Sequence, residues 1–416
     1  METARPSEET VSLRRALGLP LITLYGIGTI LGAGIYVLIG KVVAASGYYA
    51  PISFLLASLI VAFSAFSYAE LASRFPRSAG EAVYVQQAFG RDWLYTLVGM
   101  AVIITGTISS ATITTGFVGY MKLFVDVPDW LIILLLVASL GAIAAIGVHE
   151  SVLLASIITL IEVAGILLVI GVALSGMNQQ DLDLKAFIPK LSLTNWLGIT
   201  SGAFLAFYAF IGFEDMVNMA EEVRDPVRNM PRSIIIALLI TSLLYFAVAF
   251  AALNALPLDV LATSEAPFAE IIRRNSTIPP AVMGLISLVA IVNGALIQII
   301  MAARVLYGMA SQGRVPGVFA HINRVTRTPL EATAAASVVV LVLALWLPIV
   351  TLAGITSVVV LVTFTLVNLA LLRLKMQERK RAEVVASGIV VPLAVPMTGA
   401  LLCVGFVLMQ LPALWT

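Results

Sequence analysis

Long apolar runs separated by short polar stretches dominate the chain. The first extends from Ala16 to Gly40 without a charged side chain, and comparable runs recur toward the C-terminal end. A helix of about 20 apolar residues crosses the hydrocarbon core of a bilayer. The pattern therefore predicts about eleven membrane-spanning helices. Their centres are expected near residues 28, 60, 107, 139, 164, 207, 245, 292, 340, 364 and 402.

The connections between these runs are short, with a few exceptions. The run from Ala332 to Leu372 is too long for one span, and we expect it to divide near Gly354. Residues 78–90 are predicted to form a short surface helix. The longest connections are expected at residues 177–194 and 257–278.

Composition supports an all-α polytopic membrane protein. Of 416 residues, 60% are hydrophobic and 11% charged, whereas soluble domains carry about 25% charged residues. With one cysteine and two histidines, the chain has no intrachain disulfide, and a structural zinc site is not expected. We expect no cofactor, no nucleic-acid partner and no enzyme activity, because no nucleophile–base set stands out.

The basic residues set the expected orientation. With the N-terminus in the cytoplasm, eighteen of the 24 lysines and arginines fall on the cytoplasmic side and six on the outer side, as the positive-inside rule requires. We therefore expect an integral protein of the plasma (inner) membrane with a cytoplasmic N-terminus. The six outer residues are Lys41, Lys122, Lys185, Lys190, Arg273 and Arg274.

The first apolar run is unusual because it holds four glycines in nine positions, from Gly26 to Gly34. Glycine weakens a helix, and each backbone group freed in lipid is costly unless it finds another partner. A broken span of this kind favours a binding site near the middle of the membrane. The alternative is close helix packing through small residues.

A second interrupted segment follows five spans later, where Gly212 precedes Glu214 and Asp215. Matching interruptions in two halves of a membrane protein indicate an inverted repeat with a binding site between the halves. The predicted organisation is an N-terminal segment, a first five-helix repeat, an outer loop, a second five-helix repeat, and a cytoplasmic loop with one further helix. These segments are residues 1–15, 16–176, 177–194, 195–375 and 376–416.

Three motifs resemble the amino acid–polyamine–organocation transporter superfamily, and most closely its cationic amino acid transporter branch. They are Gly32–Tyr36, Tyr68–Glu81 and Phe207–Pro231. The resemblance implies ten core helices in two inverted repeats, with helices 1 and 6 unwound, and alternating access. It implies amino acids or related amines as substrates, driven by a proton or sodium gradient or by exchange. Most members have twelve spans, but only one span is predicted here after the basic run at residues 373–381, so we expect the twelfth to be absent. We also expect the protein to be a monomer or weak homo-oligomer in membrane lipid.

The ends of the broken helices suggest how such a substrate would bind. A helix start offers free N–H groups to a carboxylate, and a helix end offers free carbonyls to an ammonium group. We assign the carboxylate to the amides near Gly32–Gly34 and the ammonium to carbonyls in both breaks. By resemblance, Tyr208 also packs on the substrate side chain. The predicted substrate-binding residues are Ile30, Gly32, Ala33, Gly34, Tyr208, Ala209, Ile211 and Glu214.

Glu162 stands alone in an apolar run, and charge at the middle of a membrane points to function. Related transporters often carry a lysine here in place of a sodium ion. Glu162 would either bind a proton or help Asn293 and carbonyls near Gly28 and Leu31 to hold sodium. The alternative is a neutral acid bonded to Asn293 or exposed to a water-filled cavity.

The remaining acidic residues have less specific expectations. Adjacent helical residues point about 100° apart, so at most one of Glu214 and Asp215 should face the cavity. By resemblance, Glu214 matches an acidic position in members that move cationic substrates, and the alternative is that both residues cap the inner half-helix. Gate or loop salt bridges are expected for Glu70, Arg74, Glu81, Glu221 and Glu222. An ion channel is a rival function, but no ring of like charges is visible.

Overall fold

The computed structural model describes residues 15–32, 34–77, 80–146, 152–175, 184–381 and 388–410. Most of the predicted N-terminal segment therefore lies outside the described residues. The described chain is helical, and its one extended pairing is a bridge between Leu17 and Val223. The helices of the first half are α1 (Leu19–Leu31), α2 (Gly34–Ser46), α3 (Ala50–Arg74), α4 (Gly80–Phe89), α5 (Asp92–Met121), α6 (Asp129–Ile146) and α7 (Val152–Ser175).

The second half continues in the same way. Its helices are α8 (Leu193–Tyr208), the 3-10 segment η3 (Glu214–Glu222), α9 (Pro226–Ala255), α10 (Leu258–Thr263), α11 (Pro267–Asn275), α12 (Pro280–Ser311), α13 (Leu330–Trp346), α14 (Ile349–Arg381) and α15 (Ala394–Gln410). Short 3-10 turns also occur at Gly47–Tyr49, Leu184–Phe187 and Gly317–Ala320.

All eleven predicted centres lie in helices. Seven helical stretches among the described residues are long and apolar enough to cross a membrane, and three shorter apolar helices accompany them. The all-helical membrane architecture is thus confirmed, while the two inverted repeats stay a prediction. The expected short helix at 78–90 is present as α4.

One predicted boundary is wrong. The long apolar run divides at Leu347 and Pro348, and Gly354 lies inside α14. Proline lacks a backbone N–H and disfavours helical geometry in the residue before it. A single glycine costs a helix only about 1 kcal/mol, so Pro348 determines the break.

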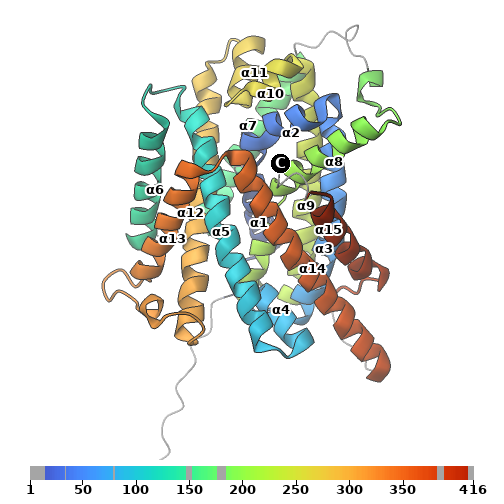
Figure 1. The fold of residues 1–416 in the computed structure, drawn as a ribbon, viewed down its shortest axis with the longest axis vertical. Helices are drawn as coiled ribbons and strands as arrows, with labels where there is room; N and C mark the ends of the chain where they lie inside the picture. The colour runs from blue at the N-terminus through green and yellow to red at the C-terminus, as the bar shows by residue number, and fades with distance from the viewer. Residues whose placement is uncertain are drawn as a thin grey trace, which may run out of the picture.

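The helices form an elongated bundle (Figure 1). Helix α5 packs along α12, and α3 packs along α9, while α1 lies between α7 and α9. Helix α4 lies at one end of the bundle, and α10 and α11 lie at the opposite end (Figure 1). By the predicted orientation, α4 belongs to the cytoplasmic end.

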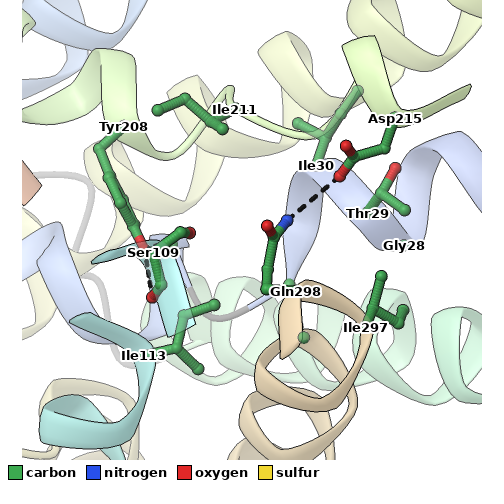
Figure 2. Close-up of a pocket in the computed structure, with 13 residues that line it drawn as sticks. Gly28, Thr29, Ile30, Ser109, Ile113, Tyr208, Ile211, Asp215, Ile297 and Gln298 are labelled. Atoms are coloured by element: carbon green, nitrogen blue, oxygen red, sulfur yellow. Dashed lines mark hydrogen bonds between the residues drawn. The ribbon is translucent and has the colours of Figure 1, made fainter. Parts of the chain in front are cut away.

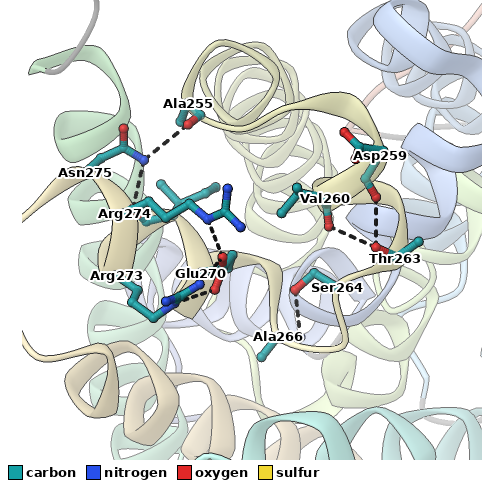
Figure 3. Close-up of polar contacts among 11 residues, drawn as sticks. Ala255, Asp259, Val260, Thr263, Ser264, Ala266, Glu270, Arg273, Arg274 and Asn275 are labelled. Carbon is teal, nitrogen blue, oxygen red and sulfur yellow. Dashed lines mark hydrogen bonds and ion pairs between the residues drawn. The ribbon is translucent and has the colours of Figure 1, made fainter.

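At the α10–α11 end, Glu270 accepts hydrogen bonds from Arg273 and Arg274, both on its own helix (Figure 3). The Arg273 hydrogen bond lowers the pKa of the Glu270 carboxyl, and Arg274 adds to the effect. Asn275 donates to the Ala255 carbonyl, 3.2 Å away, which ties α11 to the end of α9 (Figure 3).

At the opposite end, a buried ion-pair network centres on Glu70, which is fully buried. Its carboxylate contacts Arg74, and lies 2.7 Å from the Lys375 ammonium on α14. The Val391 N–H donates to it at 2.8 Å, and Lys375 donates to the Val391 carbonyl at 2.7 Å. Arg74 also contacts Glu378. The salt bridges expected for Glu70 and Arg74 are confirmed, and they link α3, α14 and the segment before α15.

The salt bridge expected for Glu81 is wrong, because no basic residue of the described chain pairs with it. Its carboxyl is buried, and Tyr68 donates to it over 3.5 Å. Helix α4 turns this residue inward instead of toward the basic groups at the surface.

Candidate functional site

The first span is interrupted as predicted. Helix α1 ends at Leu31 and α2 begins at Gly34. The Gly32 N–H still donates to the Gly28 carbonyl at 2.9 Å, with φ of 22° at Gly32. Ala33, the middle of the predicted amide cradle, lies outside the described residues. The break leaves carbonyls at the end of α1 and N–H groups at the start of α2 without helical partners.

The sixth span is interrupted as well. Helix α8 ends at Tyr208, and the next residues form tight turns in which the Ile211 N–H donates to the Tyr208 carbonyl at 3.1 Å. Gly212 follows with φ of 132°, a value that only glycine adopts readily. The chain then continues as η3, beginning at Glu214.

The two breaks touch each other. A Cβ atom on Gly34 would lie 2.7 Å from the Cα of Ala209, and one on Gly212 would meet the Thr29 carbonyl. Glycine is therefore required at both positions, because any side chain would separate the two backbones.

Tyr245 on α9 joins the breaks, and it is not among the predicted site residues. Its hydroxyl lies 2.7 Å from the Ile30 carbonyl and 2.8 Å from the Ala209 carbonyl. Tyr245 is fully buried, and a buried tyrosine hydroxyl usually has a hydrogen-bond partner. A lone tyrosine within an apolar span is the signal that points to such a role.

A cavity lies beside this crossing, with about 30 Å³ of room for water-sized molecules. Figure 2 shows that its walls come from α1, α5, α12 and the region around the second break. The lining residues are Gly28, Thr29, Ile30, Gly32, Gly34, Ser109, Ile113, Tyr208, Ile211, Asp215, Gly294, Ile297 and Gln298.

The structure brings half of the predicted site residues together here. The cavity lining includes five of the eight predicted substrate-binding residues, and Gly28 of the predicted ion site. The Tyr208 hydroxyl points toward α5, where it lies 2.9 Å from the Ser109 hydroxyl and donates to the Ser109 carbonyl at 3.1 Å (Figure 2). Five other predicted site residues do not line the cavity: Leu31, Ala209, Glu162, Asn293 and Glu214.

Asp215, not Glu214, is the acidic residue in the cavity wall. The Glu214 side chain folds back, and its Oε2 accepts a hydrogen bond from the Gly212 N–H at 2.9 Å. Gln298 on α12 donates from Nε2 to Asp215 Oδ2 at 3.1 Å (Figure 2). Sequence reasoning missed Gln298 and Ser109, both polar residues in apolar spans.

Glu162 is fully buried on α7, and neither carboxyl oxygen has a hydrogen-bond partner. The expected alternative of a bond to Asn293 is therefore wrong. The residue nevertheless adjoins the first break, since Tyr36 on α2 donates to the Glu162 backbone carbonyl at 2.8 Å. One turn earlier, Thr159 sits against Gly28 so closely that no Cβ would fit between them.

Comparison with known proteins identifies the family of the chain. The model of the family described as amino acid permease matches residues 17–415. The chain belongs to the amino acid permease family. Its membrane helices and this membership make it an integral membrane protein of a transporter family.

The permease resembles transporters whose names give different substrates. It is 30% identical over 86% of its length to "Cationic amino acid transporter 3, mitochondrial" of Arabidopsis thaliana, and covers 62% of that protein. It is 30% identical over 98% of its length to the methylthioribose transporter of Bacillus subtilis, and covers 90% of it. The branched-chain amino acid permease of the same bacterium is 27% identical over 88% of the chain, with 82% of that permease covered. The chain thus spans about three fifths of the plant relative's length.

Proposed function

We propose that this permease is a secondary transporter that moves amino acids across the membrane by alternating access. The observation that carries the proposal is the contact of two broken helices beside a cavity that both of them line. Discontinuous helices bind substrates of secondary transporters near the middle of the membrane. The distribution of basic residues favours a cytoplasmic N-terminus, and we propose the plasma (inner) membrane as the location.

The α-amino and α-carboxyl groups would bind at opposite helix ends. The start of α2 near Gly34 offers N–H groups and the positive end of a helix dipole to the carboxylate. The end of α8 offers carbonyls, with Ile211 and Tyr208 in the cavity lining, to the ammonium group. The Ile30 carbonyl already accepts from Tyr245, but a carbonyl has two lone pairs and can accept a second donor.

Asp215 favours a positively charged side chain on the substrate. It is buried, and the Gln298 amide that donates to it is neutral. A buried carboxylate needs a compensating positive charge or a proton. A basic amino acid would supply that charge, which fits the name of the plant relative. The branched-chain permease makes a neutral substrate the alternative, with Asp215 then protonated. Polyamines are the second alternative. They rank lower because a diamine lacks the carboxylate that the start of α2 would bind.

Coupling would run through Glu162. Its unpartnered, buried carboxyl favours the neutral form, because an isolated ion in such surroundings is very costly. A proton bound here in one conformation and released in another would link transport to the proton gradient. Sodium held by Glu162 and Asn293 is the alternative.

The test is radiolabelled counterflow in liposomes that contain the purified full-length permease. Lysine, arginine, leucine, putrescine and lysine amide are offered in turn, with and without sodium. We expect basic amino acids to exchange, and the diamine and the amide to be much poorer. A channel cannot accumulate label against its gradient by exchange, so conductance without counterflow would contradict the proposal. Thermal unfolding with the same compounds gives an independent binding measurement, since ligands stabilise the folded state by mass action.

A further inference from the structure

A second cavity adjoins the first. Asp215 and Gln298 line both cavities, so their hydrogen bond is part of the wall between them. The second cavity has about 20 Å³ of room for water-sized molecules and receives Glu81 from α4, the helix at the end of the bundle opposite α10 and α11 (Figure 1). Because α4 contributes to its lining, the second cavity lies on the predicted cytoplasmic side of the first cavity.

Three carboxyl groups line this inner cavity, from Glu81, Glu214 and Asp215, and no lysine, arginine or histidine does. All three are buried, with 4%, 7% and 5% of their surface exposed. Among the described residues, the side chains and backbone groups that donate hydrogen bonds to them are neutral: the Tyr68 hydroxyl, the Gly212 N–H and the Gln298 amide. Such a cluster calls for protons, or for a positive charge, to balance it.

Gln298 provides an independent sign of a missing partner. Its Nε2 donates to Asp215, but its Oε1 is buried and has no hydrogen-bond partner. A buried amide oxygen left unsatisfied costs about 1–3 kcal/mol, and a cation or an N–H donor would remove that cost. Thr105 and Thr363 add hydroxyl oxygens to the same lining, and Thr363 uses its proton to bond the Val359 carbonyl. The polar atoms around the cavity are thus mainly oxygens, the donors that hard cations prefer.

We propose that this inner cavity is a second binding site, for a monovalent cation. The shared chemistry fits an alkali ion, and it fits the charged nitrogen of a basic substrate that has left the first cavity. Binding of a substrate nitrogen at this site rests on the proposed transport function, whereas binding of an alkali ion does not. Glu81 distinguishes the inner site, because it lines this cavity and not the substrate cavity.

The test measures thermal unfolding of the full-length permease in detergent, in choline chloride at constant ionic strength. Sodium, potassium and lithium chlorides are titrated without amino acid, and lysine is titrated without alkali ions. For at least one of these cations, we expect a saturable rise in the unfolding temperature. Glu81→Gln should weaken its apparent affinity at least tenfold. Asp92→Asn, which alters an exposed carboxyl at the same end of the protein, should leave it unchanged.

The pattern of responses identifies the source of the cation. An alkali response that Glu81→Gln weakens assigns the site to a free ion. A lysine response that it weakens, with no alkali response, assigns the site to the substrate. If Glu81→Gln is unstable, Glu81→Asp keeps the charge but moves it, and should alter the order of affinities among the cations.

The inner site would be disproved if no added cation raised the unfolding temperature of the wild type above its value in choline. Unchanged cation affinities in both Glu81 variants would also disprove it. Counterflow of the wild type and the Glu81 variants in liposomes keeps this result separate from the proposed function. Transport with no Glu81 effect rejects the inner site alone, whereas alkali binding without transport rejects only the proposed function.

Discussion

A Cβ atom on Gly34 would lie 2.7 Å from the Cα of Ala209. This is closer than non-bonded carbon atoms approach, so the start of α2 and the end of α8 are in backbone contact. The atom that would have to move belongs to the main chain of the second break, not to a flexible side chain. The geometry of each break therefore depends on the other.

Gly34→Ala should abolish or strongly reduce substrate binding while the protein remains folded and monodisperse. The added methyl group must push the breaks apart and so displace the groups that line the cavity. Gly34→Leu should have the larger effect. Gly171→Ala is the matched control, because a Cβ there meets no atom within 4 Å. Substrate-induced shifts in unfolding temperature measure binding, and undiminished shifts in Gly34→Ala would disprove the assignment.

Tyr245→Phe should raise the KM for substrate by about tenfold, equivalent to about 1.4 kcal/mol. The change removes the hydroxyl next to the Ile30 and Ala209 carbonyls but keeps the ring, which packs against Phe210. Loss of a hydrogen bond of this kind costs about 0.5–1.5 kcal/mol, with more where a buried acceptor stays unsatisfied. Tyr48→Phe, at a partly exposed ring, is the control. Equal KM values in both variants would mean that Tyr245 does not hold the crossing.

The interruptions could be predicted because glycine clusters are visible in the sequence and rare in spanning helices. Tyr245 could not, because nothing in an apolar span reveals that its hydroxyl meets two carbonyls from helices far away in the chain. The choice between Glu214 and Asp215 also needed the structure. The 100° spacing applies to a regular α-helix, but the turn at Gly212 resets the direction of the chain and lets Glu214 fold back onto it. The predicted boundary at Gly354 is wrong because a single glycine breaks a helix less strongly than Pro348 does.

Lys375→Met should destabilise the permease by about 3–5 kcal/mol. Lys375 is buried and bonds both the Glu70 carboxylate and the Val391 carbonyl, so its removal leaves negative charge less balanced in a dry environment. Arg273→Met is the contrasting variant, since Arg273 is exposed and pairs with Glu270 at the surface. It should shift the unfolding temperature much less. Similar shifts in the two variants would show that the Glu70 network adds no more than a surface pair.

Glu81 should make stability fall as the pH rises from about 5 to 8. Burial raises the pKa of its carboxyl from 4.5 to about 8, and the nearby Asp215 carboxyl adds to the rise. Between these values the folded state holds a proton that the unfolded state has lost, so raising the pH favours unfolding. Glu81→Gln should flatten this part of the profile of unfolding temperature against pH. An unchanged slope would place the pH dependence on other groups, of which the Glu214 and Asp215 carboxyls share the cavity lining with Glu81.

Glu162→Gln should uncouple transport from the proton gradient and leave exchange intact. Glutamine has nearly the shape of the protonated acid, so the packing around Tyr36 and Thr159 should survive while the proton site is lost. In liposomes, the variant should exchange labelled substrate at close to the wild-type rate but lose accumulation driven by an inward proton gradient.

If sodium is the coupling ion, wild-type uptake should require sodium and the variant should lose that requirement. Asn293→Ala then separates the two cases, because it should disturb sodium coupling and spare proton coupling. Accumulation equal to wild type under both gradients would show that Glu162 has a structural role only.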